Sequence, residues 1–174
     1  MTELILGYYQ GEKNTALIAL AIGIAFLLLT VVLFFVWYKS DQLIKGLAWT
    51  FLVAGLFWTL AGVGGINYAG KKVQEVQTLN HSDTELRNAE VERMEKVFET
   101  GLAYRVAMIM FSGLIIVGLI IILINPTNLV LKGVALGMLI FGAVGHTTEV
   151  FSMRKNKAYQ EKVIEFTPRS VKIE

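Results

Sequence analysis

The stretch that decides the fold is EVERMEKVFETGLAYRVAMIM, Glu90–Met110. Its first half carries a charged residue at nearly every second or third position, and its second half is almost entirely apolar. No proline separates the halves, and Gly101 is the single glycine between them. The pattern predicts one continuous helix, from about Asp83 to Ile124, that runs from water into lipid.

Composition places the chain in a membrane. Of 174 residues, 55% are hydrophobic and 17% are charged, and the mean hydropathy is +0.58. Thr15–Tyr38, Gly46–Gly70 and Val106–Asn128 are free of charged residues, and each exceeds the about 20 residues that cross a hydrocarbon core. A shorter window, Gly133–Gly145, becomes long enough because the long side chain of Lys132 can reach the interface. Four membrane-spanning helices are therefore expected at about 15–38, 44–68, 104–124 and 129–150.

The predicted fold class is all-α: an integral membrane four-helix bundle that forms a single domain over 1–174. Helices 2 and 3 are expected to extend into an antiparallel helical hairpin on the cytoplasmic side, at about 68–103. The N-terminal TELILGYYQGEKN is expected to form a short interfacial segment, because its apolar residues lie on one side. The tail, 154–174, begins with basic residues and is expected to lie along the inner membrane surface.

The distribution of positive charge predicts the orientation. Three of the 16 Lys and Arg residues, Lys39, Lys45 and Lys132, lie in or next to the connections between spans 1 and 2 and between spans 3 and 4. The other 13 fall in the N-terminal segment, the central segment and the tail. Since positive residues stay on the cytoplasmic side, both termini and the hairpin are expected in the cytoplasm.

The hairpin is the strongest candidate for a binding surface. Ser82 followed by Glu85 is a capping box that predicts a helix start, and apolar residues then recur at helical spacing as a stripe. The preceding arm offers only a few apolar residues to cover that stripe, and a surplus of exposed apolar surface indicates a partner. The residues predicted to bind a protein partner are Leu86, Glu90, Arg93, Met94, Val97 and Phe98. Two alternatives remain open: the hairpin only terminates the bundle, or it forms the seam of an oligomer.

Few residues suggest a catalytic, metal-binding or proton-carrying role. The absence of cysteine excludes disulfides and thiolate metal sites, and a net charge of +2 is too small to suggest nucleic acid. His146 and Glu149 lie one helical turn apart near the inner end of span 4, at the depth expected for Arg105. We expect a structural Glu149–Arg105 ion pair, with a proton-sensing or proton-carrying role as the alternative, because ionisable groups inside membranes are often functional. No catalytic set, metal site or cofactor is expected.

Glycines are numerous, 16 in all. Gly133, Gly137 and Gly145 follow one another at multiples of four residues, and small residues let helix backbones approach closely in lipid. They are predicted to pack helices within the chain, with a homodimer contact as the alternative. Polar residues are scattered over the spans, which disfavours a hydrated pore within one protomer and leaves a pore within an oligomer open.

Three short motifs carry a resemblance: YYQGEKN at Tyr8–Asn14, VERMEKV at Val91–Val97 and RKNKAY at Arg154–Tyr159. They resemble a family of small, uncharacterised bacterial four-helix inner-membrane proteins, whose members often accompany polymorphic or contact-delivered toxins. The resemblance implies a bacterial inner-membrane location and an immunity or accessory role. The chain departs from the family's acidic character at His146 and Glu149, which lie in a glycine-rich setting. No catalytic residue is carried over.

Together these features favour a non-enzymatic protein that contacts membrane lipids and binds a protein partner or a second copy of itself, with a toxin as the sharpest version of the partner. The alternative function is a subunit of an oligomeric ion channel or small transporter, with His146 and Glu149 near an inner gate. A membrane enzyme is disfavoured because no convincing catalytic set is present.

Overall fold

The computed structural model describes residues 1–36, 41–78, 82–99, 102–125 and 127–167, and over these ranges every regular element is a helix. The helices are α1 (Thr2–Val36), α2 (Gln42–Thr78), α3 (Asp83–Glu99), α4 (Leu102–Ile124) and α5 (Leu129–Glu165). The predicted all-α class is confirmed.

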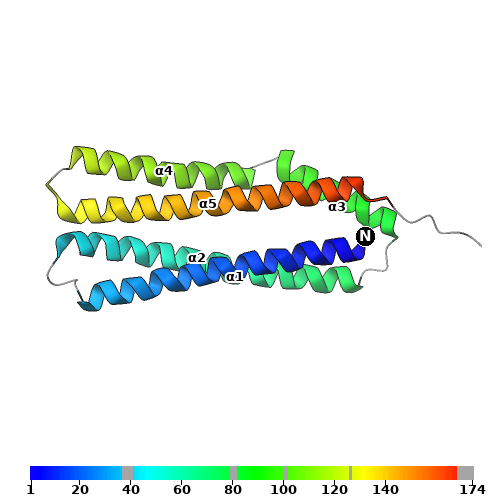
Figure 1. The fold of residues 1–174 in the computed structure, drawn as a ribbon, viewed down its shortest axis with the longest axis horizontal. Helices are drawn as coiled ribbons and strands as arrows, with labels where there is room; N and C mark the ends of the chain where they lie inside the picture. Colours follow the sequence, from blue (N-terminus) through cyan, green and yellow to red (C-terminus); the bar gives the residue numbers. More distant parts are fainter. Residues whose placement is uncertain (37–40, 79–81, 100–101, 126, 168–174) are drawn as a thin grey trace, which may run out of the picture.

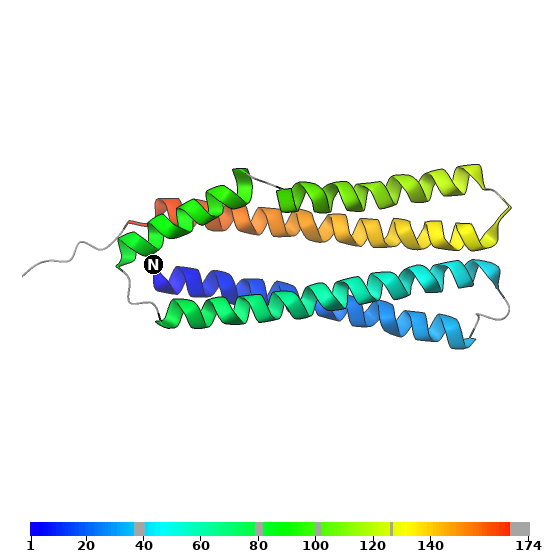
Figure 2. The same cartoon turned by 180° about the vertical axis from the view of Figure 1, so that it is seen from behind.

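The helices form a long rod, along which α1, α2 and α5 run for nearly the full length (Figure 1). α1 packs along α2, α2 packs on α5, and α4 packs on α5. α4 and α3 share the remaining edge, α4 in one half of the rod and α3 in the other (Figure 2). The N-terminus lies at the α3 end of the rod.

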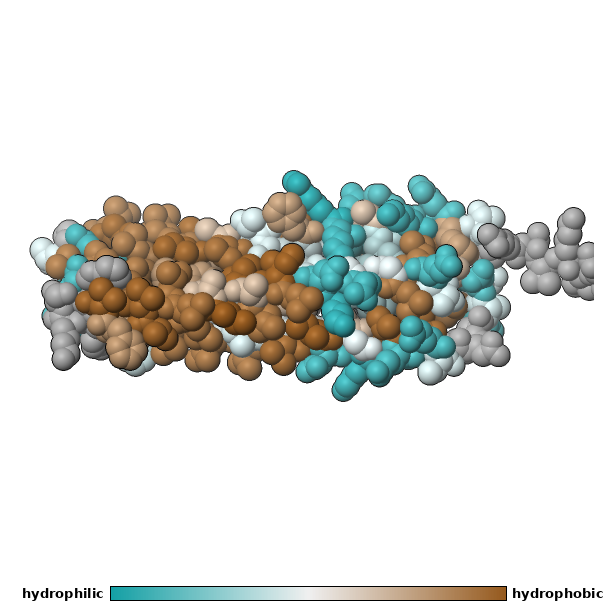
Figure 3. Space-filling model, turned by 60° about the horizontal axis from the view of Figure 1, so that its bottom comes forward, coloured by the Kyte–Doolittle hydropathy of each residue, from teal (hydrophilic) through white to brown (hydrophobic). Residues whose placement is uncertain are grey.

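The two halves of the rod have different surfaces. One half is covered by apolar side chains and the other is rich in polar ones (Figure 3). Four helical stretches are long and apolar enough to cross a membrane: Thr2–Val36, Gln42–Thr78, Asp83–Ile124 and Leu129–Glu165. This finding fits a multi-pass membrane protein. We call residues 15–36, 44–68, 104–124 and 129–150 the membrane half, and the rest of the described chain the polar half.

The N-terminal segment and the described part of the tail belong to the polar half as helix. The expected interfacial segment is instead the first part of α1, where Ile5 and Tyr9 are each 1% exposed. The expected surface-lying tail is instead the continuation of α5 as far as Glu165, where Tyr159 and Val163 are buried. Both segments differ from these expectations for the same reason: their apolar faces pack into a core formed by the other helices.

The expected continuous helix over 83–124 is described on either side of residues 100 and 101, as α3 and α4, and these two helices have different axes (Figure 2). Residues 100 and 101, including Gly101, lie outside the described residues. At about 100° per residue, Met94 and Phe111 would point about 100° apart around one straight helix. Both side chains are buried in the protein, Met94 in the core of the polar half and Phe111 in the core of the membrane half.

The hairpin takes a different form from the one expected. The capping box is confirmed, since Glu85 N–H donates to Ser82 Oγ at 3.3 Å and Ser82 N–H donates to Glu85 Oε2 at 3.0 Å. α3, however, packs mainly on α5 and not along α2. The apolar stripe of α3 packs into a core to which α1, α2 and α5 also contribute side chains. The buried members of this core are Met1, Ile5, Tyr9, Val76, Leu86, Met94, Tyr159 and Val163.

Glycines bring the helices of the membrane half together. A Cβ on Gly133 would collide with the Leu43 carbonyl oxygen of α2, and a Cβ on Gly137 would approach Thr50 at 2.5 Å. Gly145 instead faces the Phe111 ring of α4. Four residues turn a helix by about 400°, which is about 40° more than a full turn. Over the twelve residues from Gly133 to Gly145, the face on which a residue lies therefore rotates by about 120°. The three glycines therefore lie at two interfaces.

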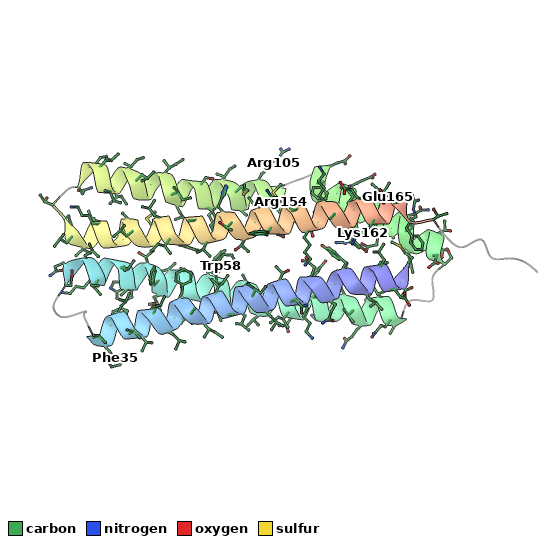
Figure 4. All side chains as sticks on the ribbon, viewed as in Figure 1. Phe35, Trp58, Arg105, Arg154, Lys162 and Glu165 are labelled. Carbon is green, nitrogen blue, oxygen red and sulfur yellow. The ribbon has the colours of Figure 1, made fainter. Side chains whose placement is uncertain are left out.

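Aromatic rings fill the space between the two helical hairpins of the membrane half. The Trp58 ring of α2 stacks on the Phe111 ring of α4 with centroids 6.2 Å apart, and Phe111 meets Phe141 of α5 edge to face at 5.8 Å. Trp58 points into the space between α2 and α5 (Figure 4). Large apolar rings, and not polar groups, therefore occupy the centre of the bundle.

Substituting Gly133 tests the α2–α5 contact. We expect Gly133→Ala to lower the free energy of unfolding by about 1–3 kcal/mol, because overpacking forces backbones apart. Gly64→Ala is the matched control, since nothing lies within 4 Å of its added Cβ and alanine is the better helix former by about 1 kcal/mol. Unfolding in mild detergent, followed by circular dichroism, measures both. Equal stability of the two variants would contradict the close contact.

Candidate functional site

A buried ion pair lies at the centre of the polar half. Arg93 Nη2 donates to Glu90 Oε2 at 2.7 Å, and Arg93 Nε lies 3.1 Å and 3.0 Å from the two carboxylate oxygens. The side chain of Glu90 is 12% exposed and that of Arg93 is 25% exposed. Both residues belong to α3, one turn apart, so the helix itself sets their geometry.

Tyrosines from α1 and α5 enclose this ion pair. The Tyr159 hydroxyl donates to Glu90 Oε2 at 3.0 Å. The Arg93 guanidinium lies 5.3 Å from the Tyr8 ring centroid and 5.4 Å from that of Tyr9, within cation–π range. Tyr8 and Tyr159 stack with their centroids 3.9 Å apart. The pair thus joins three helices that are distant in sequence.

Asn156 extends the network toward the membrane half. The Tyr8 hydroxyl donates to Asn156 Oδ1 at 2.9 Å, and Asn156 Nδ2 donates to the Tyr104 hydroxyl. Asn156 is 6% exposed, so its hydrogen bonds are made by protein. This residue of α5 links α1 in the polar half to the first turn of α4. We call the set Tyr8, Tyr9, Glu90, Arg93, Asn156 and Tyr159 the tyrosine–arginine cluster.

The tyrosines of the cluster and Arg93 each keep one charge state at neutral pH. Burial raises the pKa of Tyr8, Tyr9 and Tyr159 above the usual range of a phenol, and nearby carboxylates add to the effect. Burial alone would lower the pKa of Arg93, but the hydrogen bonds and charge of Glu90 outweigh it and raise the pKa. The phenols therefore remain neutral donors and the guanidinium remains charged. This arrangement suits a scaffold better than proton transfer.

A hollow of about 340 Å³ opens beside the cluster, between α2 and α3. Its floor is apolar, formed by Ile5, Val76 and Leu86, and its edge carries charged residues and Ala89. We call this hollow the α2/α3 groove. Its charged edge consists of Lys72, Glu75, Glu85 and Arg93, and the buried residues Tyr9 and Glu90 also line it.

The predicted partner-binding residues lie mostly inside the protein. Leu86 is 6% exposed and Met94 is fully buried, so the expected surplus of exposed apolar stripe was wrong. Leu86, Glu90 and Arg93 line the α2/α3 groove, whereas Val97 and Phe98 are half-buried further along α3.

Sequence reasoning missed the residues that cover the stripe. The signal was present: Ile5 and Tyr9 are four residues apart, as are Tyr159 and Val163, with Asn156 one turn before. Such spacing predicts one buried helix face in each segment.

The expected Arg105–Glu149 ion pair is wrong. Arg105 is exposed and points away from the bundle (Figure 4), and no ion pair joins it to Glu149. Tyr104 is the residue of this turn that meets α5, through Asn156, so Arg105 is rotated by about 100° from that contact. His146 Nδ1 is buried without a hydrogen-bond partner among the described residues.

The described part of the chain contains no group of three or more His, Cys, Asp or Glu side chains that could hold a metal ion. The cluster itself offers hydrogen-bonding groups, aromatic rings and charge.

Substituting Glu90 tests the cluster. We expect Glu90→Gln to lower the free energy of unfolding by about 1–3 kcal/mol, because it leaves the Arg93 guanidinium without its anionic partner. Glu92→Gln is the matched control on the same helix, since the Glu92–Lys96 pair is 67% and 70% exposed and exposed pairs contribute little. Chemical unfolding in detergent compares the two. A Glu92 variant that is as unstable as the Glu90 variant would contradict this role.

No protein-family model, no curated protein and no solved structure matches the chain. The geometry of the cluster and its groove is therefore the basis on which a function is proposed.

Proposed function

We propose that the chain is a non-enzymatic, multi-pass interaction protein that binds a protein partner in the α2/α3 groove of its polar half. The observation that carries the proposal is the form of this groove, in which an apolar floor lies within a charged edge. Protein interfaces commonly combine an apolar centre with a polar rim. The cluster beneath the groove holds α3 in place, and a rigid surface loses less entropy on binding.

The proposed location is a bacterial inner membrane, with both termini and the polar half in the cytoplasm. The charge distribution supports this orientation, because 13 of the 16 Lys and Arg residues lie in the segments that form the polar half, its immediate border with the membrane half, or the tail. The sharpest version of the proposal is an immunity protein that neutralises a toxin. The resemblance of YYQGEKN, VERMEKV and RKNKAY to the bacterial family supports that version.

The alternative function is a subunit of an oligomeric ion channel or small transporter. The unpartnered Nδ1 atom of His146 in the membrane half favours this alternative, because buried polar atoms usually have partners. Against it, aromatic rings fill the centre of the bundle. Substituting His146 and Glu149 by Gln changes conductance or its pH dependence in liposomes if the alternative holds.

Blocking the groove tests the proposed function. Ala89 lines the groove and is exposed, so Ala89→Arg fills the groove while keeping a good helix former. Asn88→Arg is the matched control, because Asn88 is exposed on the same helix and does not line the groove. We expect Ala89→Arg to reduce partner recovery at least tenfold in affinity purification from native membranes, with the neighbouring gene product co-expressed.

The control should recover the partner as the wild type does, with equal thermal stability of all three proteins. Undiminished recovery with Ala89→Arg would contradict docking in the groove. Conductance of the purified chain in liposomes, altered by the His146 and Glu149 substitutions, would support the alternative instead.

A further inference from the structure

A second groove runs along the opposite face, between α1 and α5. These helices make no extended backbone contact, and side chains bridge them. One hollow of about 360 Å³ is lined by Thr15, Ile18, Thr148, Phe151, Ser152 and Lys155. A second, of about 340 Å³, is lined by Glu3, Leu4, Gly7, Tyr8, Lys155, Ala158, Tyr159 and Lys162. Lys155 borders both hollows, and we call the two together the α1/α5 groove.

The position of Lys155 along α5 fits the depth of lipid headgroups. It follows Leu129, the first residue of α5, by 26 positions, which is about 39 Å along a helix. A bilayer with its headgroup regions is about 40–45 Å thick. If Leu129 lies at the outer surface, the Lys155 ammonium lies near the inner phosphates.

The part of the groove on the membrane side is suited to an acyl chain. Ile18 and Phe151 are 61% and 64% exposed, so their apolar surfaces are available to lipid. The Thr15 and Thr148 hydroxyls donate to the carbonyls of Gly11 and Val144 at 3.0 Å and 2.8 Å. Because their hydrogens are used within the helices, these hydroxyls present little polarity to a chain in the groove.

The charged part of the groove is suited to a phosphate. Lys155 Nζ pairs with Glu12 Oε1 at 2.8 Å and donates to Thr15 Oγ1 at 3.0 Å, which fixes the ammonium. An ammonium has three N–H donors, so one remains for a further acceptor. Lys162 lines the groove together with Glu3, and Arg154 and Lys157 are exposed on other faces of the same helix, so this stretch of α5 carries an excess of positive charge.

We propose that the α1/α5 groove binds an anionic phospholipid, with its phosphate at Lys155 and one acyl chain along Ile18 and Phe151. Basic pockets between helices on the cytoplasmic side of a membrane recognise such headgroups. The site lies on a different face from the α2/α3 groove, so lipid binding and partner docking succeed or fail independently.

Native mass spectrometry of the purified full chain in mild detergent tests this proposal. The probes are phosphatidylglycerol, phosphatidylcholine of the same chain length, and inorganic phosphate as a competitor. Ile18→Trp fills the acyl part of the groove, with Leu17→Trp as its matched control, because Leu17 is 46% exposed and does not line either hollow. The double variant Glu12→Gln with Lys155→Gln removes the ammonium without leaving an unpaired carboxylate.

We expect the wild type and the Leu17 variant to retain at least fivefold more phosphatidylglycerol than phosphatidylcholine. The Ile18 variant and the double variant should each lose at least fivefold of the bound phosphatidylglycerol, and inorganic phosphate should not displace it. Equal retention of the two lipids, unchanged binding by both groove variants, or displacement by inorganic phosphate alone would overturn the proposal.

Discussion

The ion pair between Glu90 and Arg93 is the interaction on which the polar half depends. Burying two charges costs free energy unless hydrogen bonds and close geometry compensate. Here the Tyr159 hydroxyl and the faces of Tyr8 and Tyr9 provide that compensation. The pair therefore ties α3 to α1 and α5 through side chains that are long and largely rigid.

The size of those side chains also explains the two grooves. In the membrane half, glycines allow α2 and α5 to touch backbone to backbone. In the polar half, stacked tyrosine rings separate α1 from α5, and α3 leans on α5 and not on α2. Hollows consequently open on both sides of the cluster, one toward the proposed partner and one toward the proposed lipid. The stacked tyrosine rings and the packing of α3 on α5 thus account for both proposed binding grooves.

Much of the fold could be predicted from the sequence, because long charge-free windows indicate membrane-spanning helices and a capping box marks a helix start. Which helices cover each apolar helix face could not be predicted from the sequence. Ile5 and Tyr9 show helical spacing, but a short amphipathic segment beside a membrane fits the interface equally well. Glu90 and Arg93 were predicted among the partner-binding residues, yet only the positions of α1 and α5 show that tyrosines surround the ion pair they form. Arg105 was paired with Glu149 by depth alone, and rotation about the helix axis separates them.

The coverage of the α3 stripe by α1 and α5 can be measured directly. The chain contains no cysteine, so Met94→Cys and Glu95→Cys each introduce one thiol, at a fully buried and at an exposed position. Maleimide labelling in permeabilised membranes should be at least tenfold faster at position 95 than at position 94. Equal labelling rates would show that the α3 stripe is open to water and would contradict the enclosed core.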